Sequence, residues 1–185
     1  FIHDFPLKNG LTIVEEFYQE KKQKLSQEVQ SLLKYEMASY LGVYEVISVT
    51  AEVGLRLKDL FTGEEMDVLE VKGSMTMVKW DIIFARVIRM EAVNKFSGMI
   101  TLIPIRSKGN VLSSIKNAWE EFKTETGKLD WSHFAKSNAQ IIHHVIEDQS
   151  LKEPIFVTEE HHKIFSCKAV FEVKKFETIR YRLSK

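Results

Sequence analysis

The stretch from Val43 to Ile105 constrains the fold most, because apolar and polar residues alternate along it as β-strands require. At its centre, Leu55–Val71 holds two strand-like segments on either side of the tetrapeptide Phe61-Thr62-Gly63-Glu64. Gly63 can adopt the positive φ that a tight turn needs. The sequence therefore predicts a β-hairpin at the middle of a larger sheet.

Further strands are expected around this hairpin. Val43–Thr50 is apolar on much of both faces, and Trp80–Met90 shows the strongest alternation. Lys72–Val78 is expected to be an irregular crossover, and a turn at Asn94–Phe96 leads into a last strand, Met99–Ile105. Five short strands can curl until the first meets the last, which gives a small antiparallel β-barrel of SH3-like or OB-like kind. An open curled sheet packed under helices fits the same spacing.

Helical spacing appears before and after the strands. Thr12 with Glu15 three residues later forms a capping-box pattern, and a second helix is expected from Leu25 to Tyr40, with Gly42 as its stop. Beyond the strands, we expect an antiparallel pair of helices. Its first member contains Val111–Phe122 and ends at Thr126-Gly127; Asp130 caps the second, whose apolar residues extend to Ile146.

Strand-like alternation returns near the end of the chain. Ile155–Thr158 and Lys163–Lys174 predict a terminal β-hairpin around Glu159–His162, and Ile179–Leu183 predicts one further short strand. The fold class is therefore α+β. We expect an N-terminal helical arm (residues 1–41), the barrel or curled sheet (42–106) and a helical pair with terminal strands (107–185), or all three as one compact domain.

Composition excludes several classes of protein. The chain has 26 basic and 26 acidic residues, so no global charge attracts it to nucleic acid or to an anionic membrane. No apolar run approaches the roughly 20 residues that cross a bilayer, and no basic stretch followed by an apolar one opens the sequence. We therefore expect a cytoplasmic protein without a membrane partner. The single cysteine, Cys167, excludes an internal disulfide and a multi-cysteine metal site, and no cofactor motif is present.

Histidine pairs are the first candidates for chemistry. His161 and His162 lie beside two glutamates at the predicted hairpin tip and are weak metal candidates. Because adjacent side chains on an extended backbone point in opposite directions, a structural role is favoured over metal binding. His143 and His144 are also consecutive, here on a predicted helix, so they diverge and cannot chelate one ion together.

Other polar residues are assigned structural roles. His3-Asp4 matches the dyad of metal-dependent phosphohydrolases, but no further ligands are placed to complete that site. Asp59 and Asp81 are expected to accept hydrogen bonds in turns, since no base is in sequence reach of either. Cys167 lies on the apolar side of its predicted strand, as a small core residue would. We predict no catalytic residue.

Charge is distributed unevenly along the chain. Residues 42–105 carry seven basic and nine acidic side chains, a net charge of −2 that suits phosphate binding poorly. Residues 163–185 carry seven basic and two acidic side chains, a net charge of +5. This segment is the candidate surface for nucleic acid or an acidic partner, and its central residues are Lys174, Lys175, Arg180 and Arg182.

Three segments carry a resemblance to a known group of proteins: Tyr44-Glu45-Val46, the stretch Gly54–Glu65 and Trp80–Val87. They resemble the uncharacterised region that follows the SEC-C metal-binding motif in a group of bacterial proteins, and Phe1–Leu7 is similar to the start of that region. The resemblance covers most of residues 1–105 and implies an intracellular bacterial protein of unassigned activity. The zinc-binding cysteines of the SEC-C motif are absent, so no metal site is implied.

Three functions follow as hypotheses. The first is a non-enzymatic binding or accessory module that docks a protein partner, with the barrel as scaffold. The second is RNA or DNA binding through the basic C-terminal segment. The third is an enzyme whose site is assembled only in three dimensions, which a deep pocket gathering Asp59 or Asp81 with a histidine would favour.

Overall fold

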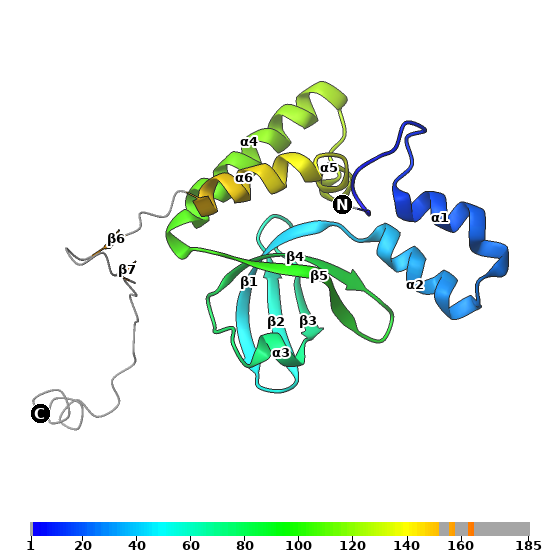
Figure 1. Ribbon diagram of the computed structural model, residues 1–185. Helices are drawn as coiled ribbons and strands as arrows, with labels where there is room; N and C mark the ends of the chain where they lie inside the picture. The colour runs from blue at the N-terminus through cyan, green and yellow to red at the C-terminus, as the bar shows by residue number, and fades with distance from the viewer. Residues whose placement is uncertain (1, 152–155, 158–162, 165–185) are drawn as a thin grey trace, which may run out of the picture. The chain divides into compact units, whose positions relative to one another are not determined.

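A closed five-stranded β-barrel forms the centre of the fold, with one helical pair before it in the chain and a second helical group after it (Figure 1). The computed structural model describes residues 2–151, 156–157 and 163–164. Residues 2–151 belong to one compact unit, Phe1–Lys152. The observed α+β class and the small barrel confirm the expectation from the sequence, whereas the division into three parts stays a prediction.

The N-terminal arm contains α1 (Ile13–Lys21), a short 3-10 helix (Lys22–Lys24) and α2 (Gln27–Ala38). The capping box is confirmed, because the Thr12 hydroxyl accepts from Glu15 N while Thr12 N donates to the Glu15 carboxylate at 2.8 Å. The predicted end of α2 at Gly42 is wrong. Gly42 pairs with Ala85 as part of the sheet, so strand pairing overrides the helix-ending preference of glycine.

The barrel follows the order β1-β2-β3-β5-β4, and β4 pairs again with β1. All pairs are antiparallel except β3 with β5, which join in parallel at Val68 and Asn94. The first strand therefore meets the fourth and not the last. Of the two predicted barrels this is the OB-like one, with the chain crossing over between β3 and β4. The strands are β1 (Leu41–Thr50), β2 (Gly54–Asp59), β3 (Glu65–Leu69), β4 (Ile82–Arg89) and β5 (Asn94–Ile103).

Two connections test the turn predictions. The hairpin is confirmed: β2 and β3 pair antiparallel, and Gly63 has φ = 76° in the turn between them. The turn predicted at Asn94–Phe96 is wrong, since these residues begin β5 and the chain reverses just before them, where Met90 N donates to Val93 O. The Asn94 amide donates to Asp67 O at 2.9 Å, which holds this residue in the sheet. The predicted crossover contains one helical turn, α3 (Val71–Ser74).

Two apolar clusters share strand β4. Ile83, Ala85 and Val87 point into the barrel, while Ile82 and Phe84 pack against the helices on the other side. Those helices are α4 (Lys108–Thr126), α5 (Trp131–Ser137) and α6 (Ala139–Leu151), and a 3-10 turn (Ile105–Ser107) leads from β5 into α4. Figure 1 shows α4 and α6 lying along one another above the barrel. The alternation in β4 therefore reflects burial on both faces, as in a strand between two cores.

The helical pair departs from prediction at one point. The second helix is interrupted at Asn138, whose φ and ψ of −121° and 25° are not helical. Its side-chain amide donates to Phe134 O, a local bond that competes with the helix ladder. The predicted ends are confirmed nearby: Gly127 terminates α4 with φ = 68°, and the Asp130 carboxylate caps α5.

The remaining described residues belong to a separate unit, Glu153–Lys185. Strands β6 (Phe156–Val157) and β7 (Lys163–Ile164) pair antiparallel, which confirms the described part of the predicted terminal hairpin. The rest of that hairpin and the strand predicted at Ile179–Leu183 lie outside the described residues. Within the described part of the chain, no helix combines the length and hydropathy that crossing a bilayer requires.

Candidate binding surface

Large apolar side chains are exposed at the end of the barrel where α3 lies. They come from the β1–β2 loop, the end of β3, α3 and the connection to β4, and each is between 43 and 62 % exposed. Large apolar side chains exposed on neighbouring segments favour a contact surface over a solvated one. We call this set the α3 surface; its members are Val53, Leu69, Val71, Met75, Val78 and Trp80.

Close backbone packing holds the first part of this surface in place. Gly54 lies so near β3 that a Cβ atom there would stand 2.2 Å from Val68 O, and Glu70 N donates to Val53 O. The β1–β2 loop is thereby pressed against the end of β3. Val53 and Leu69 are presented from backbone that is fixed on both sides.

The α3 turn is closed by its own polar residues. The Glu70 carboxylate accepts from Gly73 N at 2.9 Å, and the Ser74 hydroxyl donates to Val71 O at 2.7 Å. Gly73 and Ser74 are buried, and Met77 packs against the cluster inside the barrel. Val71 and Met75 remain on the outer side of the turn, which explains why apolar residues here stay in contact with water.

A cleft of about 460 Å³ adjoins the α3 surface. The β1–β2 and β4–β5 loops line it over the outer face of β2 and β3, and Val53 and Leu69 belong to both features. Arg56 in its lining pairs with Glu65 at 3.2 Å and with Asp67 at 3.6 Å, so carboxylates already accompany its charge. A polyanion would find no unpaired arginine in this cleft.

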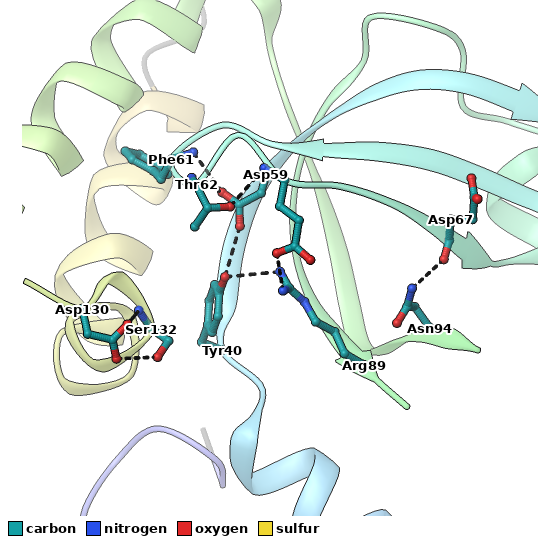
Figure 2. A network of polar contacts seen from close by, with 10 residues as sticks. Tyr40, Asp59, Phe61, Thr62, Asp67, Arg89, Asn94, Asp130 and Ser132 are labelled. Atoms are coloured by element: carbon teal, nitrogen blue, oxygen red, sulfur yellow. Dashed lines mark hydrogen bonds and ion pairs between the residues drawn. The ribbon is translucent and has the colours of Figure 1, made fainter. Parts of the chain in front are cut away.

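A polar network lies at the turn of the β2–β3 hairpin, away from this cleft (Figure 2). The Asp59 carboxylate is completely buried and accepts from Phe61 N, Thr62 N and the Tyr40 hydroxyl. Arg89 reaches the same hydroxyl at 3.4 Å and pairs with Glu64. Asp59 is therefore the turn acceptor that the sequence predicts, and Asp81 is another, since it accepts from Val78 N at 2.8 Å.

The two tyrosines at this network, Tyr40 and Tyr44, are held in their protonated form. Burial, then the charge of Asp59, raises the pKa of Tyr40, and the same causes raise the pKa of Tyr44, so both phenols stay protonated at neutral pH. The adjoining pocket measures about 250 Å³ and, like the larger cleft, has no histidine in its lining. Neither of these two pockets joins Asp59 or Asp81 to a histidine, and the enzyme hypothesis stays a prediction.

A model of a protein family, described as a family of unknown function (DUF7986), matches residues 1–136. The chain belongs to the DUF7986 family. The match takes in the helical arm, the whole barrel and α4, so the α3 surface lies inside the family region. Comparison with curated proteins and with solved structures found no match to either. The association with the SEC-C motif is untested by the DUF7986 match and stays a prediction.

Within the DUF7986 region, His3 and Asp4 are brought to Arg86 of β4. Asp4 pairs with Arg86, both side chains being almost fully buried, and His3 Nε2 lies 3.1 Å from the Glu36 carboxylate. The sequence offers no sign that Arg86 would join them, because it is 82 positions from Asp4. No group of three or more ligating side chains forms a metal site in the part of the chain that the structure describes.

The predicted binding residues of the tail have a different status. Lys174, Lys175, Arg180 and Arg182, the histidines His161 and His162, and Cys167 all lie outside the described residues, so their roles stay predictions. The sequence does not predict the α3 surface, because Lys72–Val78 is expected to be a crossover and Trp80 to begin a strand. The feature that indicates this surface is a run of apolar residues between Val71 and Trp80 that follows neither the strand period of 2 nor the helix period of 3.6.

Proposed function

We propose that this chain is a non-enzymatic binding module that docks a protein partner through the α3 surface, with the barrel as its scaffold. The observation that carries the proposal is the exposure of six large apolar side chains on backbone that is fixed by packing. Met and Trp, which are enriched at protein interfaces, are the most exposed members together with Val78. A preformed surface of this kind binds without a large ordering cost.

Charge supports a protein partner over nucleic acid at this site. The barrel has a net charge of −2, and three of its arginines are paired with carboxylates: Arg56 with Glu65 and Asp67, Arg86 with Asp4, and Arg89 with Glu64. Phosphate binding depends on arginine and lysine side chains that can release counterions. The resemblance to the region after the SEC-C motif supports an accessory role in a bacterial cytoplasmic protein.

Photo-crosslinking in cells of the source organism tests the proposal. A photoreactive amino acid replaces Met75 at the centre of the α3 surface, and a control chain carries it at Asn117, which is exposed on α4. We expect an adduct of discrete mass from position 75 that protease destroys and nuclease leaves intact, and none from position 117. Equal yields from both positions, no adduct at all, or an adduct that nuclease removes would each contradict protein docking at this surface.

A further inference from the structure

Trp80 has a backbone conformation that L-amino acids rarely adopt. Its φ is +80°, and among the described residues the only other non-glycine residue with positive φ is Glu52. For a bulky aromatic residue this conformation is strained, because Cβ approaches the backbone. Burial in the core does not offset the strain, since the side chain is 59 % exposed.

The surrounding backbone forces this conformation. Trp80 N donates to Val46 O at 2.8 Å, and Val46 N donates to Asp81 O at 2.9 Å, which fastens the turn to β1. Asp81 N donates to Val78 O, and the Asp81 carboxylate accepts from Val78 N. Strain that is held from several sides is typical of functional positions.

We propose that Trp80 is a preformed anchor that inserts into an apolar pocket with an acidic rim on the partner protein. This inference rests on the proposed docking function and names the residue and the partner chemistry that it uses. The indole projects beside exposed Val78 from a turn whose backbone is held by hydrogen bonds, so the backbone of the anchor needs no ordering on binding.

The acidic rim follows from the charges around the anchor. Lys79 places its ammonium 4.5 Å from the centre of the indole ring, and Lys72 is also exposed. The two carboxylates of the same stretch, Glu70 and Asp81, accept from the backbone of their own turns. The exposed charges of this stretch are therefore the two lysines, and Lys79 is the one in contact with the indole, so a pocket that accepts Trp80 carries a carboxylate opposite Lys79.

A nucleobase is the competing occupant, because a single strand could stack on the indole and place phosphate near the lysines. The neighbours of Trp80 favour protein. Val71, Met75 and Val78 are aliphatic and give no second stacking platform, whereas they match the apolar wall of a protein pocket. Nuclease sensitivity of the adduct separates the two occupants.

The test compares Trp80→Gly with Glu52→Gly in the chain that carries the photoreactive group at position 75. Glycine tolerates positive φ, so both variants should raise the Tm by about 2–4 °C. We expect Trp80→Gly to reduce the position-75 adduct at least about tenfold and Glu52→Gly to leave it unchanged. Lys79→Glu should reduce the adduct several-fold without lowering the Tm.

Each other outcome has a defined meaning. An adduct that persists in Trp80→Gly overturns the anchor and leaves the docking function standing. A Tm that falls in Trp80→Gly shows a structural role for the indole and also overturns the anchor. An adduct that nuclease removes assigns the surface to nucleic acid, and the absence of an adduct in the chain with Trp80 intact overturns the docking function itself.

Discussion

Arg86 and Asp4 form a buried ion pair, in which only 3 % of the Arg86 side chain and 1 % of the Asp4 side chain are exposed. Arg86 also donates to Ser39 O at 2.9 Å and to the Ser39 hydroxyl at 3.1 Å. The pair therefore joins the N-terminal segment, the end of α2 and the most buried strand of the barrel. It fixes how the helical arm leaves the barrel.

Loss of this pair should destabilise the fold strongly. Asp4→Ala leaves the Arg86 guanidinium buried without its counter-charge, and we expect a decrease of about 3–5 kcal/mol in the free energy of unfolding. Glu64→Ala removes a partly exposed pair with Arg89 and should cost less than about 1 kcal/mol. Urea denaturation followed by circular dichroism measures both; equal losses would show that the Arg86 pair is not buried in solution.

His3 should make stability depend on pH. Burial first, and then the nearby Arg86, lowers the pKa of His3 below its ordinary value of 6.5. The unfolded chain therefore takes up a proton before the folded one, so stability present above pH 6.5 is lost as the pH falls through that value. We expect His3→Gln to flatten the loss of stability between about pH 7 and pH 5. Urea titrations at several pH values measure the free energy of unfolding, and an equally steep fall with pH in His3→Gln would disprove the role of His3.

The Asp59 carboxylate should contribute more to the free energy of unfolding than the Tyr40 hydroxyl that it binds. Asp59→Ala removes the acceptor of two backbone N–H groups and one phenol, and we expect a loss of about 2–3 kcal/mol. Tyr40→Phe removes one of these bonds and should cost about 1 kcal/mol. If the order of the two losses in thermal unfolding were reversed, Asp59 would not be the organiser of the turn.

Two glycines should respond in opposite ways to alanine. Gly54→Ala places a Cβ 2.2 Å from Val68 O, so the β1–β2 loop must shift, and we expect a loss of about 1–3 kcal/mol. Gly109 in α4 has nothing within 4 Å of the new Cβ, so Gly109→Ala should stabilise by about 0.5–1 kcal/mol. Chemical denaturation measures the change in the free energy of unfolding of each variant, and no change in Gly54→Ala would contradict the close packing.

Gel retention separates docking of a protein from the nucleic-acid hypothesis. With the α3 surface as the functional site, we expect no retention of mixed single-stranded and duplex RNA or DNA at low salt. Salt-sensitive retention that disappears when Lys174, Lys175, Arg180 and Arg182 are replaced by Ala would establish the alternative function.

The features predicted correctly from sequence are local ones. The Thr12–Glu15 capping box, the turn at Gly63, the end of α4 at Gly127 and the cap at Asp130 each involve residues within a few positions of one another. Their geometry is set by side chains and backbone of the same turn. Gly42 and Asn94 were predicted wrongly because sheet partners distant in the sequence decide their conformation.

Short-range patterns in the sequence predict the class of the fold, the five barrel strands and the hairpin turn at Gly63, since alternation and turn chemistry act over short distances. Contacts between distant segments are needed to show that β4 closes the barrel against β1, that Arg86 meets Asp4 and that Trp80 stays exposed. An apolar pattern shows which side of an element prefers to be covered. Whether anything covers it depends on the packing of segments far away in the chain, and at the α3 surface no described segment does.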